Sequence, residues 1–171
     1  NYRGFQCRFA DMARGGMRAL IPRSQEMFEK ECDRLFDEVI NLSQAQQFKN
    51  KDIPEGGSKA AILVDYGTSK DEAVKGMVKG ILDLLTYDDR GELDTDHFVD
   101  YLNETEYLYL GPDENITSDL INWISDTAKK MEYKYPNAFM SSKLGIGINH
   151  KEYGVTSEGV NVYLRTVLEY L

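Results

Sequence analysis

The sequence predicts an α/β fold, a three-layer α/β/α arrangement with a mostly parallel mixed sheet. Short apolar runs of strand length alternate with amphipathic segments of helical period along the chain. Strands that alternate with helices are typical of such sheets, because each helix carries the chain back across the sheet. The length of 171 residues suits one domain, and a hydrophobic content of 42% supplies a core.

The first part of the chain is expected to form two strands and a long helix. Residues 4–9 alternate between apolar and polar side chains, the period of a half-buried strand. A turn at Gly15-Gly16 is expected to precede a second strand over residues 17–21. Ser24 is a candidate N-cap for a helix that runs to about Gln47. The apolar stripe of this helix contains Phe28, Cys32, Leu35, Val39 and Leu42.

The middle of the chain predicts a buried strand followed by a capped helix. Residues 60–64 form an apolar run of the size of a buried parallel strand. Ser69 and Glu72 have the spacing of a capping box, which predicts a helix beginning there. In that helix, Gly76 and Gly80 lie one turn apart and are expected to allow close packing against a neighbour.

The last part of the chain predicts one more strand and two helices. Residues 107–110 are a candidate strand, ended by Gly111 and Pro112. A helix is expected to begin at Thr117 or Ser118. After a loop over residues 145–154, a last helix is expected with Thr156 or Ser157 as its cap.

Charge and composition exclude several classes of function. The net charge is −9, with 29 acidic against 20 basic residues, so neither nucleic acid nor a membrane surface is an expected partner. No apolar run has the length of a membrane span. Two cysteines, Cys7 and Cys32, are too few for a disulfide framework and predict a reducing, cytoplasmic compartment. The two histidines, His97 and His150, are far apart, and no metal site can be assembled around them.

The loop over residues 49–59, KNKDIPEGGSK, is the strongest candidate for chemistry. Gly56 and Gly57 can let the backbone approach a ligand closely. Lys59 follows them at the start of a buried strand, where partial desolvation suits a lysine to acid–base work. The alternative from composition alone is an exposed loop with solvated lysines.

Four segments together resemble the glutamate dehydrogenases, most closely the large NAD-specific type. The lysine loop is similar to the family segment in which a lysine, a proline and a glycine-rich turn precede the catalytic lysine. The other segments are DMARGGMR (residues 11–18), GPDE (111–114) and HKEYGVTSEGV (150–160). They stand in the family's order and span most of the chain.

The resemblance implies a role for each matching residue. Lys59 matches the catalytic lysine, which assists water addition at the substrate carbon, and Asp113 matches the aspartate that shuttles protons. Lys49 matches the lysine that pairs with the substrate α-carboxylate, and Arg14 stands where smaller relatives place a lysine for the side-chain carboxylate. Gly56 and Gly57 are then expected beside the substrate. Thr156 matches a threonine near the nicotinamide.

The activity implied is the reversible NAD-dependent oxidative deamination of L-glutamate to 2-oxoglutarate and ammonia, by a homo-oligomer. No G-x-G-x-x-G turn occurs in the sequence, so no binding site for the cofactor is evident in it. Residues 1–150 are therefore expected to bind substrate. Residues 151–171 are expected to form a linker helix that leads to a nucleotide-binding domain absent from this chain.

Several alternatives remain open at this stage. Lys49 and Lys51 could exchange roles, because the spacing to Lys59 is shorter than in the small enzymes. Arg14 could instead turn outward and pair with a surface acid such as Glu55 or Asp11. Another amino acid could be the substrate. Residues 86–102 resemble part of an EF-hand, which makes a non-catalytic calcium-binding or scaffold module the alternative of another class, although Arg90 and His97 stand at ligand positions.

Overall fold

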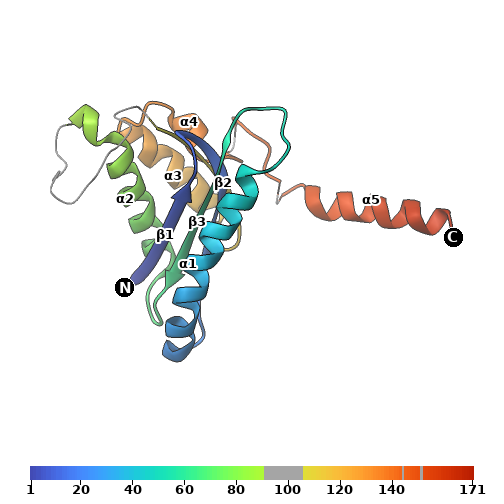
Figure 1. Cartoon of the computed structure of the whole chain (residues 1–171), viewed down its shortest axis with the longest axis horizontal. Coiled ribbons are helices and arrows are strands. Elements are labelled where there is room, and N and C mark those ends of the chain that lie inside the picture. The colour runs from blue at the N-terminus through green and yellow to red at the C-terminus, as the bar shows by residue number, and fades with distance from the viewer. Residues whose placement is uncertain (91–105, 144, 151) are drawn as a thin grey trace.

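The computed structural model describes residues 1–90, 106–143, 145–150 and 152–171 (Figure 1). Four strands and five helices occur in these ranges. In chain order they are β1 (Tyr2–Arg8), β2 (Met12–Leu20), α1 (Gln25–Gln47), β3 (Gly56–Val64), α2 (Lys70–Arg90), β4 (Tyr107–Pro112), α3 (Ser118–Lys130), α4 (Pro136–Phe139) and α5 (Val155–Glu169). Most of the segment that resembles an EF-hand falls outside the described residues.

The sheet has four strands in the order β1-β3-β2-β4. β3 pairs antiparallel with β1 and parallel with β2, and β2 also pairs parallel with β4. Helix α1 covers one face of the sheet, while α2 and α3 cover the other (Figure 1). The predicted three-layer α/β/α arrangement with a mostly parallel mixed sheet is confirmed.

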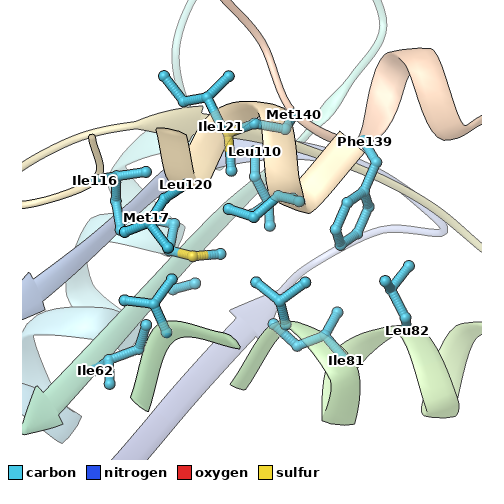
Figure 2. Close-up of a cluster of buried hydrophobic side chains, with 14 of the residues drawn as sticks. Met17, Ile62, Ile81, Leu82, Leu110, Ile116, Leu120, Ile121, Phe139 and Met140 are labelled. Carbon is cyan, nitrogen blue, oxygen red and sulfur yellow. The ribbon is translucent and has the colours of Figure 1, made fainter. Parts of the chain in front are cut away.

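The central strand β3 is buried along nearly its whole length and serves two cores. Because side chains alternate along a strand, Ile62 and Val64 pack toward α2 and α3, whereas Ala61 and Leu63 pack toward α1. Figure 2 shows the larger core, where side chains of α2, α3 and α4 meet over the sheet. A run that is apolar at every position is therefore the expected sequence of this strand.

Side-chain caps fix the starts of three helices where the sequence predicts them. Ser24 accepts a hydrogen bond from the Met27 amide at 3.2 Å. Ser69 accepts one from the Glu72 amide at 3.4 Å, which is one half of the predicted capping box. Thr117 caps α3 in the same way. Each cap satisfies an amide that has no partner inside its helix.

The predicted turn at Gly15-Gly16 is wrong, because both glycines lie inside β2. A Cβ atom on Gly15 would lie 1.5 Å from the carbonyl oxygen of Ser58 on the neighbouring β3. Glycine is required here by the close approach of two strands. The second strand consequently begins at Met12.

The predicted loop ends earlier than expected, since Gly56 and Gly57 are buried residues of β3. A Cβ atom on Gly57 would lie 2.0 Å from the carbonyl oxygen of Ser43 in α1. The Gly57 amide donates to the side chain of Gln47 at 2.7 Å. The glycine pair therefore lets α1 pack on the sheet.

The end of the chain differs in two ways from the prediction. Helix α4 was not expected, and α5 begins after Gly154, whose φ of 56° is left-handed, without a cap from Thr156 or Ser157. Helix α5 has no buried residue among those described and projects from the body of the molecule (Figure 1). Within the described residues, no helix is long and apolar enough to cross a membrane.

The packing of α1 on β3 predicts that Gly57→Ala destabilises the fold. The added methyl group collides with the backbone of α1, so we expect a loss of about 2–3 kcal/mol in the free energy of unfolding. Gly80→Ala is the matched control, because a Cβ atom at Gly80 in α2 meets nothing within 4 Å. That control should gain about 0.5–1 kcal/mol. Equal unfolding midpoints for both variants in urea would contradict the packing argument.

Candidate active site

A cavity of about 500 Å³ opens at one end of the sheet. Its walls come from four stretches that are distant in sequence: the middle of β2, residues 46–55 at and after the end of α1, the end of β4, and residues 141–150. The sheet places the first three side by side, because β2 pairs with both β3 and β4. The size suits a small organic ligand.

Three cationic side chains line this cavity. Arg14 comes from β2, while Lys49 and Lys51 come from the segment between α1 and β3. The Lys51 side chain is only 16% exposed, so its charge is poorly screened by water. A wall of this composition favours an anionic ligand.

A lysine–aspartate pair stands at the same end of the sheet. The ammonium group of Lys59, on β3, donates a hydrogen bond to the carboxylate of Asp113, which follows β4 and lines the cavity. The Lys59 side chain is 13% exposed and that of Asp113 is 43% exposed. The Asp113 amide also donates to the Met17 carbonyl at 2.9 Å, which fixes the residue beside β2. Such a pair can hold and pass a proton at the edge of the cavity.

Gly16 makes room for this pair. Strand β2 lies between β3 and β4, so a side chain on it could separate Lys59 from Asp113. A Cβ atom on Gly16 would lie 1.8 Å from an oxygen of the Asp113 carboxylate. The missing side chain therefore clears the space in which the carboxylate meets the lysine.

Glu55 is a carboxylate set among the cations. Its side chain is 12% exposed and accepts a hydrogen bond from Lys51 at 3.1 Å. The same oxygen lies 3.6 Å from Arg14, whose guanidinium group also stands 4.9 Å above the ring of Tyr109. The pairing of Arg14 with Glu55, left open from the sequence, is present, and Arg14 lines the cavity as well.

The structure brings most of the predicted site residues together. Arg14, Lys49 and Asp113 line one cavity, and Lys59 is bonded to Asp113. Thr156 lies in the first turn of α5, exposed to solvent. Lys49 and Lys51 both reach the cavity, so their roles stay interchangeable.

Several residues of the cavity were not predicted from the sequence. Glu55 was expected only as a possible surface partner of Arg14, although it lies four residues after Lys51 and directly before the glycine pair. Tyr109 had none, because it reads as an ordinary strand residue. The wall from residues 141–150 contains Ser141, Ser142, Asn149 and His150, none of which was predicted as a site residue.

The described residues can be compared with what a metal ion and a dinucleotide require. No group of three or more histidine, cysteine, aspartate or glutamate side chains there could hold a metal ion. The connections from β2 to α1 and from β3 to α2 lack the glycine-rich turn that lets a backbone approach a pyrophosphate. The part of the chain that the structure describes does not fit NAD as a whole.

Comparisons with known proteins agree with this geometry. Residues 1–168 match the family model described as bacterial NAD-glutamate dehydrogenase, catalytic domain. The chain is 40% identical over 174 residues to the NAD-specific glutamate dehydrogenase of Neurospora crassa and 37% identical over 177 residues to that of Saccharomyces cerevisiae. Each alignment covers 99% of this chain but 16% of the relative.

The fold has a counterpart among solved structures. A hetero-hexameric glutamate dehydrogenase from Thermus thermophilus aligns with a TM-score of 0.51 and 16% identity, covering 85% of this chain and 34% of that one. At this identity the likeness concerns the fold alone. The family match and the identities to the curated relatives, each over nearly the whole chain, lead to one conclusion: this chain belongs to the family of the bacterial NAD-glutamate dehydrogenase catalytic domain.

Proposed function

We propose that the chain is the substrate-binding part of an NAD-dependent glutamate dehydrogenase, which interconverts L-glutamate with 2-oxoglutarate and ammonia. The observation that carries the proposal is the Lys59–Asp113 pair at the edge of a cavity lined by three cations. Relatives that align with almost the whole chain are named for this activity. The chain spans 16% of their length, so the activity would belong to a longer polypeptide.

The charges of the cavity suit a dicarboxylate. Arg14, Lys49 and Lys51 line the cavity together with the carboxylates of Glu55 and Asp113, and Lys59 stands at its edge, paired with Asp113. The four cations exceed the two carboxylates by two formal charges, which matches the two carboxylates of 2-oxoglutarate. An apolar amino acid would leave part of this positive charge without a ligand carboxylate to pair with.

The proposed division of labour follows from position. Lys49 or Lys51 pairs with the α-carboxylate and Arg14 with the side-chain carboxylate, which orients the substrate before it reacts. Asp113 exchanges a proton with the substrate nitrogen. Lys59 assists the addition and loss of water at the carbon that bears this nitrogen. Oxidation itself belongs to the cofactor, NAD, which another part of the polypeptide would hold.

The proposed domain organisation assigns residues 1–150 to substrate binding and residues 151–171 to a linker helix toward the nucleotide-binding domain. The exposure of α5 supports this, because its apolar side chains, Val160, Leu164 and Val167 among them, lie in solvent. We place Thr156, in its first turn, near the nicotinamide. A homo-oligomeric enzyme in the cytoplasm is proposed as well, and the free cysteines Cys7 and Cys32 are consistent with a reducing compartment.

Lys59→Ala in the full-length enzyme is expected to lower kcat for glutamate about 100-fold or more while the protein remains folded. The reason is the loss of the group that assists proton transfer and water addition beside Asp113. Steady-state kinetics with circular dichroism as the folding check make the measurement. Lys30→Ala, on the exposed face of α1, is the control and should keep parental kcat. Turnover of Lys59→Ala within a few-fold of the parent would refute the assignment.

Arg14→Leu tests the substrate. Removing the guanidinium group is expected to raise KM for glutamate about tenfold to a hundredfold, since a charge-assisted contact to the side-chain carboxylate is lost. The preference for glutamate over norvaline should fall in parallel, because the leucine offers an apolar surface instead. Initial rates with both amino acids give the answer, and unchanged glutamate kinetics would remove Arg14 as the side-chain anchor.

A protein made of residues 1–171 alone is expected neither to oxidise glutamate nor to bind NAD with a dissociation constant in the micromolar range. The basis is the lack of a glycine-rich phosphate-binding turn in the sequence. Isothermal titration calorimetry with NAD makes the test, and the full-length enzyme is the positive control. Micromolar binding to residues 1–171 would overturn the proposed domain boundary.

A further inference from the structure

A second cavity of about 620 Å³ adjoins the first and shares three residues with it, Arg14, Glu55 and Tyr109. Its other walls are largely apolar or aromatic, with Met12, Tyr107, Tyr133 and Tyr135 among them. The hydroxyl group of Tyr133 is already bonded to the backbone, accepting from the Leu108 amide at 3.0 Å. Arg14 thus lies at the boundary between a cationic cavity and an aromatic one.

Arg14 has room to move at this boundary. Its side chain is 48% exposed and borders open volume on both sides. Two contacts hold the guanidinium group in place, the Glu55 carboxylate at 3.6 Å and the face of Tyr109 at 4.9 Å. A long, flexible side chain that is about half exposed loses much conformational entropy when it binds a ligand.

The two contacts respond differently to a bound dicarboxylate. A carboxylate binds the N–H groups of arginine, and the Glu55 carboxylate already forms an ion pair with one of these nitrogens at 3.6 Å. The contact with Tyr109 places the charge of the guanidinium group over the face of the ring, and a carboxylate does not compete for that face. The contact with Tyr109 can therefore persist in the complex, whereas the contact with Glu55 competes with the ligand.

The sheet fixes Tyr109 in this position. Arg14 and Tyr109 are direct partners in the parallel pairing of β2 with β4, so their side chains leave the sheet on the same face. Tyr109 is half-buried, and its strand neighbours Leu108 and Leu110 are buried in the core. Because its strand neighbours are packed in the core, the ring of Tyr109 is held in place and can position the flexible side chain of Arg14.

We propose that Tyr109 is a positioning residue that holds Arg14 toward the substrate cavity and so sets the preference for a dicarboxylate. The proposal rests on the proposed function, because Arg14 is there the anchor of the side-chain carboxylate. Without the ring, Arg14 is free to turn into the aromatic cavity. The site then binds glutamate less well and rejects apolar side chains less strongly, while the Lys59–Asp113 chemistry is untouched.

The test uses three variants of the full-length enzyme: Tyr109→Leu, Tyr109→Phe and, as the control, Tyr107→Leu. Tyr107 lines the aromatic cavity but not the substrate cavity.

Tyr109→Leu is expected to raise KM for glutamate about fivefold, the size expected from the loss of one cation–π contact, while kcat stays within twofold of the parent. Tyr109→Phe keeps the aromatic face and should restore the parental KM, and Tyr107→Leu should leave it unchanged. The ratio of kcat/KM for glutamate to that for norleucine should fall in Tyr109→Leu alone.

The outcomes separate this inference from the proposed function. If the parent enzyme oxidises glutamate and Lys59→Ala does not, the proposed function stands. An unchanged KM in Tyr109→Leu, or a KM raised equally in Tyr109→Phe, then overturns the role of Tyr109 alone. If Tyr109→Leu unfolds, the test rests on Tyr109→Phe and Tyr109→Trp. Both variants must keep the parental KM for glutamate, and a raised KM in either of them overturns the inference. A parent without glutamate turnover refutes the proposed function first.

Discussion

The ion pair between Lys59 and Asp113 depends on a constraint that runs through three strands. Lys59 lies on β3 and Asp113 follows β4, and β2 stands between them. They can meet because β2 presents Gly15 and Gly16 at this level, where side chains would collide with Ser58 and with the Asp113 carboxylate. The glycine pair of β2 thus allows the close strand spacing and also opens the space in which Lys59 meets Asp113.

The charge balance of the cavity follows from the same architecture. The segment after α1 carries Lys49, Lys51 and Glu55 to the end of the sheet, where Arg14 on β2 completes the set. Glu55 holds Lys51 and Arg14 within reach of each other, although both are cations. In the proposed site Lys51 is therefore held in place before an anion enters, whereas Arg14 exchanges Glu55 for the ligand.

The second glycine pair, Gly56 and Gly57, allows a helix to pack closely on a strand. Gly56 and Gly57 let the last turn of α1 lie directly on β3, and the amide of Gly57 bonds to Gln47 there. That contact fixes the end of α1, and with it the start of the segment that carries the cavity lysines. In the described part of the chain, packing between a helix and a strand therefore determines where the cationic wall of the cavity begins.

The sequence by itself determined the layers, the caps of α1, α2 and α3, and the candidate site residues Arg14, Lys49, Lys59 and Asp113. Periodicity and cap chemistry are local, so Ser24, Ser69 and Thr117 could be read directly. The tertiary structure alone decided that both glycine pairs lie in strands, because a turn and a close approach call for the same residue. It also decided the places of Glu55 and Tyr109 beside Arg14. Those contacts follow from strand register and chain reversal, which join residues too far apart in sequence for any local pattern to connect.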